Sequence, residues 1–195
     1  VPKGSFVVVE GPSGSGKSTL FKLVLGAYDA EGFTYELARD GSAASCIASQ
    51  VPPGVFAYVP QDNFLFAGTV RENVAFAASD ATDEQIERAC KAACAWDFVK
   101  ELPLRLDTMI GEHGQGLSQG QLQRLAIARA ICSGAPIMVL DEVTSALDDA
   151  TEAAVLANIA ALPDKTVFVA AHRAKAHEFA TMCLRVENGV MSKVH

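Results

Sequence analysis

The chain has 195 residues and a formal net charge of -7 at pH 7, with half of its residues hydrophobic and a fifth charged. These values predict one folded domain with a sizeable core and exclude an intrinsically disordered chain. The acidic balance weighs against a nucleic-acid-binding surface, which is normally rich in Lys and Arg. No apolar run approaches the ~18 residues that a membrane-spanning helix needs, and no signal peptide is visible after Val1.

The first half of the chain opens with a predicted strand and a predicted helix on either side of a glycine-rich turn. Phe6–Val9 is a short β-branched run that predicts a buried strand. Apolar residues at helical spacing follow the turn and predict the helix: Leu20, Phe21, Val24 and Leu25. Residues 31–56, interrupted by Gly and Pro, are predicted to form short strands and loops.

Two capping boxes mark helix starts further along the chain. Thr82–Gln85 predicts the start of one helix, and Ser118–Gln121 predicts the start of another. Residues 101–117, which lie between these helices, are expected to form a loop. Thr151–Ala161 is predicted to be a further helix.

Two further apolar runs have the length and composition of buried strands. Pro136–Leu140 is followed by Asp141 and Glu142, and Thr166–Ala170 ends near His172. Short apolar strands that alternate with helices predict an α/β fold, in which a parallel sheet carries helices on both faces.

The cysteines give no clear sign of a metal site or a disulfide framework. They are irregularly spaced, and their number is odd: Cys46, Cys90, Cys94, Cys132 and Cys183. Cys90 and Cys94 lie one helical turn apart, but no Cys or His pair lies nearby to complete a site. We therefore expect the cysteines to be small buried side chains that stay reduced in the cytosol.

The turn after the first strand fits the pattern G-x-x-x-x-G-K-[ST] completely. In this pattern the glycines let successive backbone N–H groups point at phosphate oxygens, and the helix N-terminus adds partial positive charge. Lys17 would reach the β- and γ-phosphates, and the Ser18 hydroxyl would bind Mg²⁺. We expect ATP to be bound here by Gly11, Ser13, Gly14, Gly16, Lys17, Ser18 and Thr19.

Polar side chains are also predicted at the carboxyl ends of other strands, where parallel sheets bind their ligands. We expect Asp141 to hold the hydration shell of Mg²⁺ and Glu142 to polarise an attacking water. His172 would reach the γ-phosphate from the same edge. Gln61 has an amide that can touch both Mg²⁺ and water. Taken alone, a single histidine or loop amide is more often structural or merely exposed.

Ser118 has two interpretations at the start of its helix. Its hydroxyl is a normal N-cap. A helix start is also an anion site, and Gly116 and Gly120 would let a ligand approach closely. The local sequence does not identify that anion.

Taken in order, these segments resemble the nucleotide-binding domain of ATP-binding-cassette (ABC) proteins over nearly the whole chain. Six motifs carry the resemblance: Walker A (Gly11–Thr19), the Q-loop glutamine (Gln61), the signature (Leu117–Gln121, LSQGQ against the family's LSGGQ), Walker B with its catalytic glutamate (Ile137–Glu142), the D-loop (Ser145–Asp148) and the switch histidine (His172). The signature separates this family from other phosphate-loop ATPases.

The resemblance implies a P-loop NTPase (RecA-like) fold and a specific dimer. The parallel-sheet core would span 1–62 and 135–195, and a small α-helical subdomain with the signature would span 63–134. Two such domains would pair head to tail around two ATP molecules. Ser118 and Gly120 of one domain would bind the γ-phosphate held by Lys17 of the other, which supplies the missing anion. ATP would close this dimer and hydrolysis would open it.

Two stretches are similar to exporter-type cassettes. Thr108–Gly114 resembles TxVGExG, and Asn63–Val74 resembles the segment that touches the membrane domain's coupling helix. The resemblance implies an ATPase that drives export at the cytoplasmic face of the cell membrane, through a six-span membrane domain that precedes Val1. A soluble cassette acting on nucleic acid or ribosomes is the alternative, and the acidic charge and the lack of a coiled-coil insertion weigh against it. The intact motifs weigh against a degenerate regulatory cassette.

The chain departs from the family pattern in three places. Gln119 replaces the first central glycine of the signature, and we expect activity to be retained. The family's adenine-stacking aromatic lies well upstream of Walker A, whereas ten residues precede Gly11. We therefore expect this fragment to bind ATP weakly. We also expect it to be mostly monomeric without nucleotide, because half of each composite site is exposed. Residues 31–56 match the family poorly.

Overall fold

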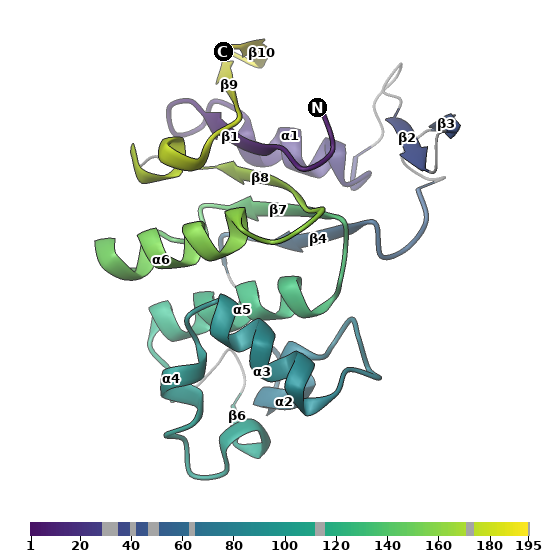
Figure 1. Cartoon of the computed structure of the whole chain (residues 1–195). Coiled ribbons are helices and arrows are strands. Elements are labelled where there is room, and N and C mark those ends of the chain that lie inside the picture. The colour runs from purple at the N-terminus through teal and green to yellow at the C-terminus, as the bar shows by residue number, and fades with distance from the viewer. Residues whose placement is uncertain are drawn as a thin grey trace.

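The computed structural model describes residues 1–28, 35–39, 42–46, 51–62, 65–111, 116–170 and 174–194. Its centre is a six-stranded sheet in the order β10-β9-β1-β8-β7-β4, which Figure 1 shows from top to bottom. Five strands are mutually parallel, and β10 is antiparallel to β9. Their bounds are β1 (Phe6–Glu10), β4 (Phe56–Val59), β7 (Ile137–Asp141), β8 (Thr166–Ala170), β9 (Met182–Glu187) and β10 (Val190–Lys193).

The central strands β1, β8 and β7 are buried on both faces of the sheet, which is why they are almost continuously apolar. Successive side chains of a strand point to opposite faces, so β1 contributes to two separate cores. Val7 and Val9 pack with Phe21 of helix α1 (Lys17–Val24) on one face. Phe6 and Val8 belong to the core of the other face, to which α5 (Gln119–Cys132) and α6 (Asp149–Ala160) contribute. The predicted α/β class is confirmed.

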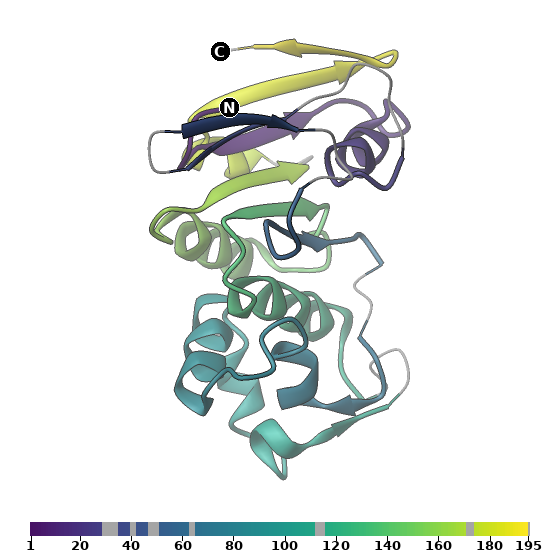
Figure 2. The same ribbon diagram turned by 90° about the vertical axis from the view of Figure 1, so that its right-hand side faces the viewer.

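A group of helices lies beyond the β4 edge of the sheet in Figures 1 and 2. It contains α2 (Val70–Val74), α3 (Asp83–Ala92), α4 (Trp96–Val99), the 3-10 turn η2 (Arg105–Asp107), the two-residue strands β5 (Gly68–Thr69) and β6 (Met109–Ile110), and α5. Helix α5 packs against both α3 and β4, so it joins this group to the sheet. The group lies within residues 63–134, and the division into core and helical subdomain remains our proposal.

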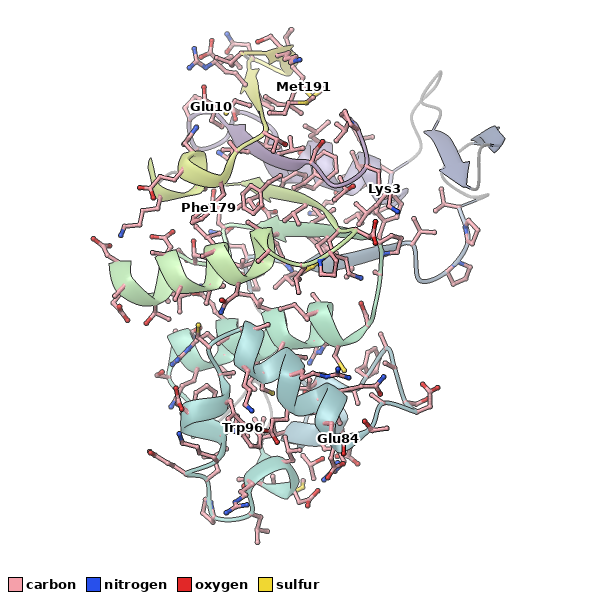
Figure 3. The ribbon with its side chains drawn as sticks, in the orientation of Figure 1. Lys3, Glu10, Glu84, Trp96, Phe179 and Met191 are labelled. Carbon is pink, nitrogen blue, oxygen red and sulfur yellow. The ribbon has the colours of Figure 1, made fainter. Side chains whose placement is uncertain are left out.

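Two smaller elements complete the described chain. The strands β2 (Tyr35–Arg39) and β3 (Ser42–Cys46) form an antiparallel hairpin apart from the main sheet. The 3-10 helix η4 (Ala174–Phe179) packs against β1 and α6. Figure 3 labels Phe179, whose ring centroid lies 6.2 Å from that of Phe6.

The predicted helix starts are confirmed, and several elements differ from expectation. Thr82 and Ser118 both form complete capping boxes in front of α3 and α5. Helix α6 begins earlier than predicted because Asp148 accepts hydrogen bonds from two backbone N–H groups as its N-cap. Residues 101–117, expected to be a loop, contain η2 and β6. A third capping box at Thr69 starts α2, and its sequence signal, Thr69–Glu72, was available but was missed.

No helix within the described ranges is long and apolar enough to cross a membrane. The four cysteines whose side chains are described are free thiols, and Cys90 and Cys183 are buried. Burial raises the pKa of the Cys90 thiol to about 12, which makes it a poor nucleophile at neutral pH. Cys46 lies in β3, outside the described side chains.

Candidate nucleotide site

The parallel strands bring the predicted site segments together at the carboxyl ends of the strands, which form one edge of the sheet. Val9 of β1 pairs with Ala170 of β8, and Ala170 pairs with Asp141 of β7. Next along the sheet, Leu140 pairs with Val59 of β4. The chain leaves β1, β7 and β4 at this edge, so the segments that follow these strands are neighbours although they are far apart in sequence.

The loop after β1 has the backbone of a phosphate cradle. Gly14 and Gly16 have φ of 77° and 104°, values that favour glycine, and Gly16 is the N-cap of α1. Gly11 has φ of 152°, and a Cβ atom there would lie 2.2 Å from the backbone oxygen of Val186. Glycine at position 11 is therefore required by close packing against β9 as well as by the turn. Ser13 and Thr19 are exposed, and Ser18 is half-buried.

Lys17 is the first residue of α1, and its side chain contacts both the loop and the acidic side of the site. Lys17 is 5% exposed, and its Nζ donates to the carbonyl oxygens of Gly11 (2.9 Å) and Pro12 (3.1 Å). The same Nζ lies 3.9 Å from Oε1 of Glu142. Gln61 donates from Nε2 to Oε2 of Glu142 at 3.2 Å. The structure therefore brings Lys17, Glu142 and Gln61 into one contiguous cluster.

Glu142 has an unusual backbone for a residue of its type. Its φ is 54°, in the left-handed region, where a non-glycine residue costs about 1–2 kcal/mol. Its N–H donates to the carbonyl oxygen of Ala170 on the neighbouring strand at 3.2 Å. Strained backbone of this kind often occurs at functional sites, where the surrounding structure holds it. Here the conformation directs the carboxylate toward the loop.

Asp141 has one carboxyl oxygen available at the same edge. The residue is 2% exposed, and its Oδ2 accepts a hydrogen bond from the Tyr58 hydroxyl at 3.3 Å. Its Oδ1 is buried and has no hydrogen-bond partner among the described residues, as is the case for Oγ of Ser15 in the loop. A buried, unsatisfied carboxyl oxygen is costly, and oxygen atoms are the ligands that Mg²⁺ prefers. These residues therefore fit a hard cation beside the phosphate loop. Within the described residues, no cluster of three or more His, Cys, Asp or Glu could hold a metal ion by itself.

We expect one tyrosine of the three in the chain to ionise unusually late. Burial, reinforced by the Asp141 carboxylate, raises the pKa of Tyr58 from 10.0 to about 12. Because the pKa is raised in the folded state, the stability linked to this proton is complete below the unfolded pKa and is lost as the pH rises toward 12. Tyrosinate absorbance during a pH titration measures the step. Tyr58→Phe should remove it, whereas Tyr28→Phe, at an exposed position, should not. A single common step for all tyrosines would contradict the assignment.

The signature residues Ser118 and Gly120 form no hydrogen bond with the phosphate loop in the described part of the chain. Ser118 is exposed and caps α5: its Oγ accepts from the N–H of Gln121, whose side chain accepts from the N–H of Ser118. Among the described residues, no hydrogen bond or ion pair joins Ser118 or Gly120 to the loop Gly11–Thr19. His172 and the Glu112–Gly114 part of the exporter-like stretch lie outside the described residues.

Sequence reasoning missed two polar residues that the structure ties to these motifs. Tyr58 contacts Asp141, and its only signal was an aromatic hydroxyl at the end of a strand. Gln123 is 3% exposed and contacts the segment after β7. Its signal was a polar side chain on the apolar face of the helix that begins at Gln119.

The parallel sheet, the glycine loop before α1 and the carboxylates after β7 define a phosphate-loop nucleotide-binding domain. The chain belongs to the ABC transporter family, whose model matches residues 1–145. This membership makes the ligand of the loop ATP. The predicted family and P-loop fold are confirmed.

The curated relatives are bacterial transport proteins. The chain is 44% identical over 191 residues to the ATP-dependent lipid A-core flippase of Thiobacillus denitrificans, which covers 97% of this chain and 33% of that protein. It is 42% identical over 191 residues to the protein of the same name from Photobacterium profundum, covering 97% and 32%. The chain thus spans about a third of the length of these relatives.

A solved structure agrees with the sequence comparison. The chain is similar to a bacterial Atm1-family ABC exporter with ATP bound, with a TM-score of 0.83 and 34% sequence identity. The match covers 97% of this chain and 33% of the exporter chain.

Proposed function

We propose that this chain is the ATP-hydrolysing domain of an exporter and that it works as a head-to-tail pair of domains around two ATP molecules. The observation that carries the proposal is the separation of two anion-binding elements. The loop with Lys17 and Glu142 lies at the sheet edge, whereas the Ser118 helix start is exposed and makes no hydrogen bond to it within the described residues. Each element would be completed by a second domain.

The residues at the sheet edge have distinct proposed roles. Backbone N–H groups of the loop and the Lys17 ammonium would bind the phosphates. Ser18, Asp141 and Gln61 would hold Mg²⁺, which supplies positive charge against the phosphate oxygens. Glu142 would accept the proton of the attacking water. Gln61, which donates a hydrogen bond to the Glu142 carboxylate at 3.2 Å, would orient that carboxylate. The proposed γ-phosphate contact of His172 rests on the resemblance alone.

An exposed aromatic surface supports a membrane-domain partner. Phe76 is 67% exposed, and its ring centroid lies 5.3 Å from that of Phe66. The Arg129 guanidinium lies 5.6 and 5.8 Å from these two ring centroids and donates to the carbonyl oxygen of Asn73 at 2.8 Å. Aromatic side chains and arginine are enriched at protein–protein interfaces. We propose that the coupling helix of the membrane domain docks on this aromatic surface.

The activity of the whole protein follows from these parts. ATP-driven closing and opening of the domain pair at the cytoplasmic face of a membrane would drive export. The relatives named lipid A-core flippase and the Atm1-family exporter both support export. Their names differ, so they leave the transported substrate open. All of these comparisons are with exporters, which disfavours the alternative of a soluble ATPase acting on nucleic acid or ribosomes.

The composite site is tested by Ser118→Asp in the protein expressed from its complete gene. Aspartate caps a helix as well as serine does, so α5 should keep its start. A carboxylate about 4 Å from a partner's γ-phosphate should lower ATP hydrolysis at least about a hundredfold, because like charges there cost about 4 kcal/mol. ATP binding to the loop should change little, because Ser118 lies away from it.

The matched control is Thr82→Asp, the same change at the equivalent capping box of α3. This variant should hydrolyse ATP at the rate of the unmodified protein. Equal hydrolysis by the Ser118 and Thr82 variants would refute the head-to-tail site.

A further inference from the structure

A buried amide on the signature helix contacts the segment after β7. Gln123, in the second turn of α5, is 3% exposed. Its Nε2 donates to Oγ of Ser145 at 3.1 Å, and its Oε1 accepts from the N–H of Ala146 at 3.1 Å. Both polar atoms of the amide are therefore used, and both partners belong to the D-loop, Ser145–Asp148.

A second contact between the same two segments is independent of Gln123. A Cβ atom at Gly120 would lie 3.1 Å from the backbone oxygen of Ala146 and 3.4 Å from Cδ2 of Leu147. The first turn of α5 thus packs directly on the D-loop backbone. Leu147 is 5% exposed and belongs to the same core as α5, so the D-loop is anchored on this side.

The opposite side of the same helical turn is fixed as well. Arg124 donates from Nε to the carbonyl oxygen of Gly120 at 3.1 Å and from its terminal nitrogen to that of Cys94 at 2.8 Å. Its guanidinium lies 5.0 Å from the ring centroid of Phe98. The start of α5 is therefore held between the D-loop and the α3–α4 turn, and Gln123 makes the polar contact on the D-loop side.

We propose that Gln123 is a positioning residue for ATP hydrolysis, which locks the D-loop to the signature so that one domain presents both to its partner's nucleotide as a single rigid unit. This inference rests on the head-to-tail site proposed above. Ser118 and Gly120 would contact the partner's γ-phosphate, and the D-loop would cross the interface beside it. A D-loop that moved independently of α5 would leave one of the two contacts out of place. Small displacements of positioning groups have large effects on rate.

The kinetic effect of replacing Gln123 distinguishes a positioning role from a role in stability alone. Within the described chain, Gln123 forms no hydrogen bond with the residues Gly11–Thr19, so its loss should lower kcat and leave the KM for ATP nearly unchanged. In the protein expressed from its complete gene, Gln123→Leu should lower kcat at least about fivefold, within the usual range of coupling between contacting groups. The KM should change by less than about twofold.

Ser145→Ala supplies the second variant. Ser145 is exposed, so this change should not disturb folding. It removes one of the two hydrogen bonds and should give a smaller loss of kcat in the same direction. Because both changes break the same contact between α5 and the D-loop, the double variant should have a kcat no lower than that of Gln123→Leu alone. Additive losses, or an unchanged kcat for Ser145→Ala, would overturn the proposal.

Asn158→Ala is the matched control, because Asn158 is also an amide that bridges two elements. It donates from α6 to the carbonyl oxygen of Ala92 at 3.0 Å, away from the D-loop. This variant should keep the kcat of the unmodified protein. Equal kcat losses for the Asn158 and Gln123 variants would show a structural role only. If the unmodified protein fails to hydrolyse ATP, the proposed function fails. If it hydrolyses ATP and Gln123→Leu keeps its kcat, only the positioning role fails.

Discussion

Glu142→Gln is expected to slow ATP hydrolysis about a hundredfold or more, the range of a lost general base, while ATP binding stays intact. Glutamine has the same shape as glutamate but cannot take up the proton of the attacking water. Lys17 should also keep its hydrogen bonds to the loop carbonyl oxygens in this variant, although the charge 3.9 Å from its Nζ is removed. Steady-state hydrolysis and nucleotide titration of the same variant separate the two effects.

Glu10→Gln is the matched control for this prediction. Glu10, labelled in Figure 3, also stands at the carboxyl end of a strand, and its side chain is 22% exposed against 23% for Glu142. Its carboxylate pairs with Arg185 on β9, away from the phosphate side of the loop. Hydrolysis by this variant should stay close to that of the unmodified protein. Unchanged turnover in Glu142→Gln would remove Glu142 from the role of base.

Lys17→Ala is expected to weaken ATP binding about a hundredfold, since hydrogen bonds to charged groups are worth about 1.5–3 kcal/mol each. In the present structure its ammonium donates to the carbonyl oxygens of Gly11 and Pro12. The same buried group is therefore already positioned at the mouth of the loop. Calorimetric titration with ATP and Mg²⁺ measures the loss.

Lys22→Ala removes the same charge from the same helix and serves as the control. Lys22 is exposed and lies 5.9 Å from the ring centroid of Tyr28, on the side of α1 away from the loop. Its loss should change the dissociation constant by less than about twofold, because exposed charges are screened. An ATP affinity that is normal in Lys17→Ala would undermine the phosphate-loop assignment.

Much of the fold could be predicted from short-range patterns. The buried strands around Val8, Val139 and Val169 follow from continuous apolar runs, and α3 and α5 follow from their capping boxes. Other elements carry weak local signals. Strand β10 is exposed along its length, and β9 alternates only partly, so neither has the apolar run that predicts a buried strand.

The candidate site divides in the same way. Lys17 and Ser18 are predicted from the local pattern of strand, glycine turn and helix, because a phosphate loop is built from consecutive residues. Tyr58 and Gln123 are not, because their roles depend on partners that lie 83 and 22 residues away in the sequence. Strand pairing and helix packing create such contacts, and neither is written in the local pattern.

By itself, the sequence determined that this protein is an α/β domain with a phosphate loop and an ABC signature, because glycine spacing, capping boxes and apolar runs act over a few residues. Only the tertiary structure decided how these parts meet. Parallel pairing of β1, β8, β7 and β4 placed Lys17, Glu142 and Gln61 in one cluster. Packing of α5 on the D-loop gave Gln123 its two partners and left Ser118 exposed. These contacts are long-range, so they exist only once the sheet has ordered its strands.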